Sequence, residues 1–314
     1  MTGYIGRRLL SSIPTLILIS MVVFGILALA PGDPLGQFAA NPDIPPEVRM
    51  NIRHQLGLDQ PVPVRYVKWA TAFLHGDWGY SFASRVPADR LILQRLPTDL
   101  WVIGSSYLVA VALAIPIGVL SAVKQYSLLD QVATTFAFIG FSLPTFFTGV
   151  LFIIIFSVRL HWLPFIYNAQ LTDPVAMLKQ AVMPVGVLAL FNSAALMRFV
   201  RSSMLDNVGQ DYVRTARAKG LAHRKVIMRH VLRNGLIPVV TLLALGVPAI
   251  FIGAIVTEQI FRVPGIGSLL ISSIQNSDTP VVMAITFVYA ILVVLFNIMA
   301  DVLYGLLDPR IRYG

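Results

Sequence analysis

The chain has 314 residues, of which 56% are hydrophobic and only 12% are charged, and its mean hydropathy is +0.76. A soluble protein carries about twice that charged fraction, and a disordered chain needs low hydrophobicity, so this composition excludes both and indicates a membrane protein. The chain contains no cysteine, which excludes disulfides and thiolate-based metal or catalytic sites, and its net charge is +9.

Six long segments without Asp, Glu, Lys or Arg follow one another along the chain. Each contains 18 to 28 residues, and a helix needs about 20 apolar residues to cross the hydrocarbon core of a bilayer. The sequence therefore predicts an all-α integral membrane protein with six transmembrane helices. These segments are residues 9–32, 100–123, 131–158, 180–197, 234–257 and 279–300.

Lys and Arg are distributed unequally between the two sides of these segments. One side carries 14 of them, nine of which lie between Arg198 and Arg233, whereas the short loops of the other side carry only Arg159, Lys179 and Arg262. Because positive charge is retained on the cytoplasmic side, we expect both termini to be cytoplasmic. The first segment is longer than the core of a signal peptide, so we expect it to remain as a membrane helix.

This topology predicts three parts of the chain. They are an N-terminal tail with the first transmembrane helix (1–30), an extracytoplasmic helical loop (31–98), and a transmembrane core of five helices (99–314) with a cytoplasmic coupling loop (198–235).

The extracytoplasmic segment shows the signals of two short helices. Prolines precede residues 47–56 and Gly57 follows them, while residues 64–74 have one apolar side and end before Gly76. Together with Trp78, these helices predict a compact cap. The cap either packs on the ends of the transmembrane helices or serves as a docking surface for an external partner.

The predicted transmembrane helices contain almost no ionisable group, which disfavours a self-contained carrier driven by protons or sodium. Several of them contain a proline, including Pro116, Pro144, Pro184 and Pro248, and a proline bends a helix by removing one backbone hydrogen bond. Polar residues beside these bends are candidates for a translocation pathway, although each could instead bond a neighbouring helix. The candidate pathway residues are Ser142, Pro144, Thr145, Asn192 and Asn297.

The inner segment from Arg198 to Arg233 carries nine basic and two acidic residues, a net charge of +7. Within it, Asp211 is expected to cap the start of a helix and Gly220 to end that helix about three turns later. We expect Tyr212, Thr215, Ala216 and Lys219 to share one side of this helix, and Arg214, Arg217 and Leu221 the other.

Four roles are open to this segment on the residues alone. It could only set the orientation of the chain, it could bind anionic lipid, it could bind nucleic acid, or it could be held by a cytoplasmic protein. Nucleic acid is disfavoured because this segment shows no set of aromatic stacking platforms and no known binding module.

The run from Asp211 to Leu221 resembles the coupling loop of ATP-binding-cassette importer permeases, in the variant typical of the dipeptide, oligopeptide and nickel branch. Here Arg214-Thr215-Ala216 precedes Gly220, where the archetype has Glu-Ala-Ala. Further motifs of that branch are Tyr4 to Leu9, Pro31-Gly32-Asp33-Pro34, Gly57-Leu58-Asp59, Gly76 to Ser81, Leu232-Arg233-Asn234 with Ile237-Pro238, and Leu307-Asp308-Pro309-Arg310.

The resemblance implies the type I importer permease fold and the role of the first of two transmembrane subunits in a bacterial inner membrane. The implied cargo is a di- or oligopeptide; the alternatives are a nickel chelate, glutathione or an opine-like conjugate. The implied partners are a second homologous permease, two cytoplasmic ATP-binding subunits or domains, an extracytoplasmic substrate-binding protein and the lipid bilayer, with no nucleic acid.

We expect the chain itself to be non-catalytic, with no metal site and no bound cofactor. It lacks the G-x-x-x-x-G-K-[ST] phosphate loop, so ATP and Mg are expected in the partner ATPase subunits. The residues expected to couple to the ATPases are Asp211, Tyr212, Arg214, Thr215, Ala216, Arg217, Ala218, Lys219, Gly220 and Leu221.

Two other classes of protein compete with this interpretation. A membrane-embedded enzyme would need a nucleophile and a base at matched depth, and the histidines have no such partners in the predicted helices. A passive channel would function without ATPases.

Overall fold

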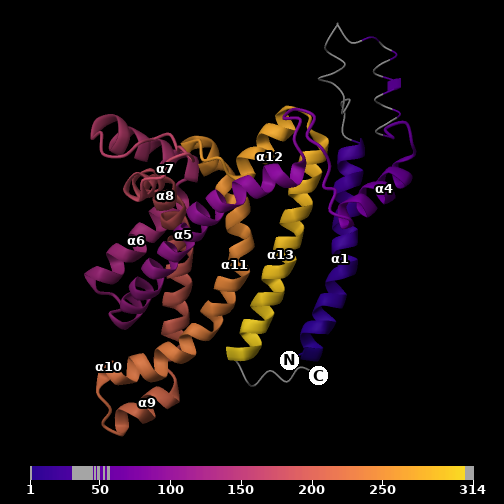
Figure 1. Cartoon of the computed structure of the whole chain (residues 1–314). Helices are drawn as coiled ribbons and strands as arrows, with labels where there is room; N and C mark the ends of the chain where they lie inside the picture. Colours follow the sequence, from indigo (N-terminus) through magenta and orange to yellow (C-terminus); the bar gives the residue numbers. More distant parts are fainter. Residues whose placement is uncertain are drawn as a thin grey trace. The chain divides into compact units, whose positions relative to one another are not determined.

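The computed structural model describes residues 2–29, 45, 47, 50, 51, 54 and 57–307. In these residues every regular element is a helix, and one isolated β-bridge joins Tyr80 and Pro87, so the all-α prediction is confirmed (Figure 1). The predicted motifs at residues 31–34 and 308–310, and most of the predicted helix at 47–56, lie outside the described residues.

The helices follow one another along the chain in the order of Figure 1. They are α1 (Thr2–Leu29), α4 (Val62–Leu74), α5 (Ala88–Val123), α6 (Leu128–Ser142), α7 (Thr145–Phe152), the π-helix η1 (Ile153–Arg159), α8 (Pro174–Val208), α9 (Asp211–Ala218), α10 (His223–Val226), the π-helix η2 (Ile227–Val231), α11 (Leu232–Phe261), α12 (Ile266–Gln275) and α13 (Thr279–Leu307).

Within the described residues, five helical segments are long and apolar enough to cross a membrane, and two bent pairs raise the number to seven at most, so the predicted six lies within that range. The third predicted helix is one of the bent pairs: α6 and the α7–η1 segment differ in direction by 103°. Pro144 explains the break, because a proline has no N–H and disfavours helical geometry in the residue before it. Leu143 accordingly has extended backbone angles (φ −85°, ψ 127°).

The chain forms two compact units, which we describe separately. The first unit contains residues 1–97 and 265–295, and the second contains residues 98–264 and 296–314. Because α5 is continuous from Ala88 to Val123, the predicted boundary between the extracytoplasmic loop and the core falls inside a helix.

In the first unit, α4 packs on α1 through aromatic side chains. The Tyr66 hydroxyl lies 2.8 Å from the Ser20 hydroxyl, and the rings of Tyr66 and Phe24 meet edge to face with their centroids 5.6 Å apart. Phe73 stacks on Trp78 and also contacts the ring of Phe287 in α13. The predicted helix at 64–74 is therefore confirmed, and its apolar side packs on membrane helices.

Two of the predicted motifs in the first unit are tight turns with glycine in the left-handed region. Gly57 has φ +63°, and beside it His54 Nδ1 lies 2.7 Å from the Asp59 carboxylate, a hydrogen bond that lowers the pKa of Asp59. Gly79 has φ +95°, and a Cβ at this position would lie 3.0 Å from Cβ of Pro280.

The Gly76–Ser81 motif is held against the start of α13 by Asp278. Ser81 Oγ and the backbone N–H of Phe82 donate hydrogen bonds to the Asp278 carboxylate, and both Ser81 and Asp278 are buried. This buried carboxylate fixes the loop that follows α4 onto the α12–α13 turn.

In the second unit, parts of α5, α6, α8 and α11 share one apolar core with α9 and α10. Two glycines permit close approach of these helices. A Cβ at Gly118 would lie 2.8 Å from the backbone oxygen of Met197, and a Cβ at Gly235 would lie 2.9 Å from Sδ of Met204. Gly235, which lies between the Leu232-Arg233-Asn234 and Ile237-Pro238 motifs, thus marks the place where α11 crosses α8.

Candidate functional site

The helix α9 forms at the predicted place, with a shift of one residue at its start. Gln210 occupies the N-cap position and makes no side-chain cap bond, and Asp211 is the first helical residue. Its carboxylate still lies in the first turn, where the helix dipole favours negative charge. The predicted capping bond of Asp211 is therefore wrong, but the negative charge of Asp211 still stabilises the start of α9.

The end of α9 agrees with the prediction for Gly220. Gly220 has φ +77°, its N–H donates to the carbonyl of Arg217 (2.9 Å), and the N–H of Leu221 donates to that of Ala216 (3.4 Å). This pair of bonds is the Schellman arrangement, which favours glycine because the residue after the cap is left-handed.

The buried side of α9 differs from the predicted division. Val213 and Ala216 are buried and belong to the core with Met204 of α8, and Leu221 packs against that core. Ala216, which is predicted among the residues that couple to the ATPases, is thus covered by the core of this chain. Helical periodicity places Val213 and Ala216 on one side of α9. Packing against the core, and not the amino-acid composition of α9, determines that this side faces inward.

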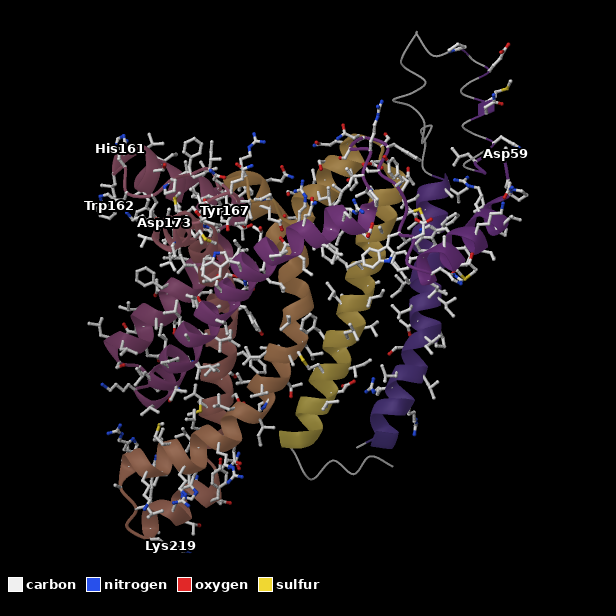
Figure 2. The ribbon with its side chains drawn as sticks, viewed as in Figure 1. Asp59, His161, Trp162, Tyr167, Asp173 and Lys219 are labelled. Carbon is white, nitrogen blue, oxygen red and sulfur yellow. The ribbon has the colours of Figure 1, made fainter. Side chains whose placement is uncertain are left out.

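The exposed side of α9 is polar and strongly basic. Its exposed residues are Asp211, Tyr212, Arg214, Thr215, Arg217, Ala218, Lys219 and Gly220. Arg224 and Lys225 of α10 add two further exposed cations, and the contact between Arg214 and Asp211 is long (3.5 Å) and exposed. We name α9, α10 and the turn between them (residues 211–226) the α9–α10 hairpin. Figure 2 shows Lys219 at its tip and Trp162 and Asp173 at the opposite end of the same unit.

The predicted coupling loop 198–235 is almost entirely helical. The helix α8 continues to Val208, and only residues 209–210 and 219–222 lie outside helices. The Tyr212 hydroxyl of the hairpin donates to Asn207 of α8 (2.8 Å), and Ser203 Oγ of α8 donates to the carbonyl of Gly235 in α11 (2.7 Å). The basic segment is therefore a rigid extension of α8 and α11.

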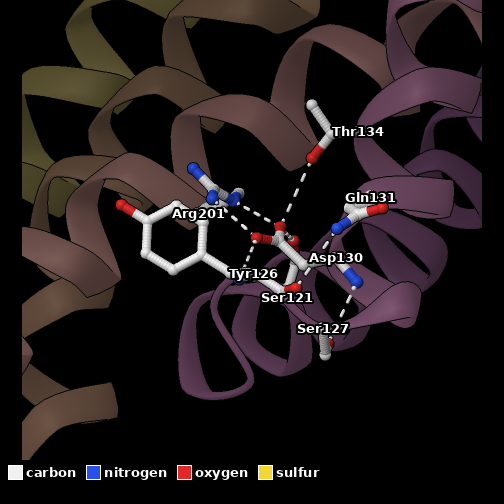
Figure 3. Close-up of polar contacts among 7 residues, drawn as sticks. All are labelled: Ser121, Tyr126, Ser127, Asp130, Gln131, Thr134 and Arg201. Atoms are coloured by element: carbon white, nitrogen blue, oxygen red, sulfur yellow. Dashed lines mark hydrogen bonds and ion pairs between the residues drawn. The ribbon is translucent and has the colours of Figure 1, made fainter.

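A largely buried ion pair connects α8 to the first turn of α6 (Figure 3). Arg201 of α8 binds both carboxylate oxygens of Asp130, through Nε at 2.7 Å and a terminal nitrogen at 2.8 Å. Asp130 also accepts hydrogen bonds from Ser121 Oγ, from the backbone N–H of Tyr126 (2.9 Å) and from Thr134 Oγ1 (3.3 Å). We name Asp130 and these four partners the Asp130 clamp.

Sequence reasoning missed the Asp130 clamp, since it used Asp130 only as the limit of an uncharged segment and Arg201 only as one of nine basic residues of the inner segment. One signal was available, because Asp130 is the only acidic residue between Asp99 and Asp173. A lone acid at the end of a membrane helix needs a cationic partner when it is buried. Nothing in the sequence, however, identifies Arg201 as that partner.

An apolar groove of about 600 Å³ lies between α5, α6, α7 and α8 in the second unit. Of the predicted pathway residues only Thr145 lines it. Asn192 donates a hydrogen bond to the carbonyl of Leu188 in its own helix (2.7 Å), so this contact shows neither a pathway role nor the bond to a neighbouring helix that the sequence left open. The assignment of Ser142, Pro144 and Asn297 to a pathway stays a prediction.

Comparison with known proteins identifies the family. The family model described as "Binding-protein-dependent transport system inner membrane component" matches residues 114–313, and the corresponding N-terminal model matches residues 1–102. The chain belongs to this family. The resemblance that the motifs suggested is therefore confirmed, and the chain is a multi-pass permease component.

Similar proteins extend over the whole chain. It is 41% identical to the oligopeptide transport system permease protein AppB of Bacillus subtilis, with 100% of both chains covered. It is 38% identical to the glutathione permease GsiC of Salmonella typhimurium (100% of both chains) and 36% identical to the dipeptide permease DppB of Escherichia coli (100% and 99%).

One solved structure supports the fold. A crystal structure of an amino acid ABC transporter with histidines matches with a TM-score of 0.51 and 15% sequence identity, covering 71% of this chain and 95% of that one. This similarity concerns the fold alone, and it agrees with the predicted fold of an ABC importer permease.

Proposed function

We propose that the chain is one of two transmembrane subunits of an ATP-driven importer in a bacterial inner membrane, and that its cargo is a di- or oligopeptide. The observation that carries this proposal is the full-length similarity to permeases named for oligopeptides, dipeptides and glutathione, itself a small peptide. The apolar helices and the basic, exposed α9–α10 hairpin fit that role.

In this proposal the energy enters through α9. Two cytoplasmic ATPase subunits bind ATP and Mg, and the two subunits close on the nucleotide. The exposed Tyr212, Thr215 and Gly220 contact a groove of one ATPase, while Arg214 and Arg217 pair with acidic residues at its rim. Ala216 has no part in this contact, because it is buried in the core of this chain.

An extracytoplasmic binding protein delivers the peptide on the opposite side. It docks on the segment that contains α4 and favours the outward-open, ATP-bound state. Each partner must prefer one of the two states, since a partner with equal affinity for both shifts nothing. The second permease completes the pathway.

The proposal is tested by purifying the tagged chain from native membranes and reconstituting it in vesicles. We expect a second permease and ATPase subunits to co-purify, and we expect uptake of labelled di- and oligopeptides that needs ATP and the binding protein. Uptake of glutathione but of no other peptide would exclude the broad peptide cargo. Uptake without nucleotide, or a chain that purifies alone, would contradict the importer itself.

A further inference from the structure

The helix α6 packs along α8 in the second unit and borders the apolar groove. The apolar groove separates much of it from α5, so it is held mainly along α8. That contact uses small or flat groups: a Cβ at Gly140 would lie 3.3 Å from Cβ of Ala194, and the rings of Phe141 and Phe191 stack at 6.3 Å. Arg198 of α8 also lies over the rings of Phe138 and Phe141, at 5.3 and 4.9 Å from their centroids. None of these contacts is a bidentate pair of opposite charges, so they set the register of the two helices less tightly than such a pair does.

The Asp130 clamp adds a directional contact that sets the position of α6 along α8. Its members come from α5 (Ser121), the α5–α6 turn (Tyr126), α6 (Asp130 and Thr134) and α8 (Arg201), and all converge on one carboxylate (Figure 3). A bidentate pair between a guanidinium and a carboxylate is strong and directional. The clamp therefore sets the register of α6 against α8.

A continuous path leads from the clamp to the α9–α10 hairpin. Arg201 lies in α8, which runs without a break to Val208, two residues before the N-cap of α9. Beside it, Val200 and Met204 share one core with Val213 of α9. A force applied to α9 thus reaches Arg201 through packed, helical structure.

We propose that Asp130 and Arg201 are positioning residues that make α6 move together with α8 and α9, so that movement of the hairpin reaches the bent α6–α7 pair. This inference rests on the proposed function, since it needs partners that move α9. The 103° bend beyond Ser142 then converts displacement of α6 into displacement of α7. Without the clamp, α8 and α9 would move while α6 slides.

The first test measures peptides imported per ATP hydrolysed by the whole transporter in vesicles. Asp130→Asn keeps the shape of the side chain but removes its charge, and we expect a fall in this ratio of at least about fivefold at unchanged assembly. Asp206→Asn is the matched control, because Asp206 is an exposed acid on the same helix as Arg201. We expect that control to leave the ratio unchanged.

A double variant separates positioning from mere stability. Asp130→Asn combined with Arg201→Gln leaves no unpaired charge buried, so a purely structural role predicts recovery of the normal ratio. The proposal predicts that the ratio stays low, because two amides do not restore the bidentate pair. Recovery in the double variant would overturn the proposal, and so would an unchanged ratio in Asp130→Asn.

The second measurement follows the movement directly and is independent of the cargo. The chain has no cysteine of its own, so spin labels can be placed at the exposed positions Thr135 of α6 and Lys219 beside α9. In the native chain we expect one narrow distance between the two labels, the same in the nucleotide-free and ATP-bound complexes. In the double variant we expect the distance between the labels to change when ATP binds. A native distance that changes with ATP, or an unchanged distance in the double variant, would overturn the inference. Absence of ATP-driven peptide import by the native complex would instead contradict the proposed function.

Discussion

Two buried aspartates, one in each unit, hold the chain in different ways. Asp278 in the first unit and Asp130 in the second are both almost fully buried, and both accept hydrogen bonds from a serine hydroxyl and from backbone N–H groups. Of these two aspartates, Asp130 alone also has a cationic partner among the described residues, which is Arg201. Asp278 therefore fastens a loop to a helix start, whereas Asp130 joins three helices.

The difference has an energetic consequence. Neutral donors replace the water that a carboxylate loses on burial, and each such bond contributes modestly to stability. A buried ion pair adds little stability beyond an apolar pair of similar volume, but removing one partner leaves an uncompensated charge. We infer that the ion pair serves to fix geometry, while the Asp278 contacts serve to close a loop.

The largest expected effect follows from removing only the cation. Arg201→Met leaves Asp130 buried and unpaired, which costs about 3–5 kcal/mol in unfolding free energy. Thermal unfolding of the purified complex would measure this loss. The charge-free double variant Asp130→Asn with Arg201→Met should recover most of it, and a loss as large in the double variant would contradict the role of the unpaired charge.

Asp278→Ala should have a smaller effect that stays local. It removes the acceptor for Ser81 and Phe82, and one unsatisfied buried donor costs about 1–3 kcal/mol. We expect faster hydrogen exchange in residues 79–86 and unchanged exchange in α9. Loss of protection in α9 would show that this aspartate, like Asp130, acts beyond its own loop.

Gly79→Ala tests the same loop through its backbone. The left-handed φ of +95° and the contact with Pro280 both oppose a Cβ, at a cost of about 1–2 kcal/mol. Gly104→Ala is the matched control, because Gly104 has an ordinary φ and a Cβ added there would meet no atom within 4 Å. Equal melting temperatures of the two variants would contradict the strain assigned to Gly79.

Gly220→Ala should have the smallest effect on stability. Its φ of +77° opposes a Cβ, at a cost of about 1 kcal/mol, but the surrounding space is open. We expect weaker association with the ATPases, because the end of α9 is distorted at the exposed contact. Gly209→Ala, at a glycine with an ordinary φ in equally open space, is the control. Equal ATPase association of both variants would argue against a contact at Gly220.

The sequence predicts most of the helices because membrane burial excludes charge, and charge-free segments are visible without any tertiary information. The glycine end of α9 is predictable for a similar reason, since a left-handed residue after a helix cap favours glycine. The proline at 144 indicates a break. The 103° change of direction depends on how α7 packs on α8 and α11, which no local pattern contains.

The polar contacts within the two units could not be predicted from the sequence, because their partners lie far apart in the chain. Asp130 and Arg201 are 71 residues apart in the chain, and Ser81 and Asp278 are 197 residues apart. A hydrogen bond between such residues depends on the whole arrangement of helices. The same holds for Ala216, whose burial is set by the core beneath α9 rather than by the periodicity of α9 itself.

The most direct test of the central claim is site-specific photo-crosslinking from the tip of the α9–α10 hairpin. A photoreactive residue at Lys219 should crosslink to a nucleotide-binding subunit in native membranes. The same group at the exposed Trp162, at the opposite end of the unit, should not. Crosslinks from position 219 to lipid alone, with no nucleotide-binding subunit among the products, would contradict the claim that this permease is driven through α9.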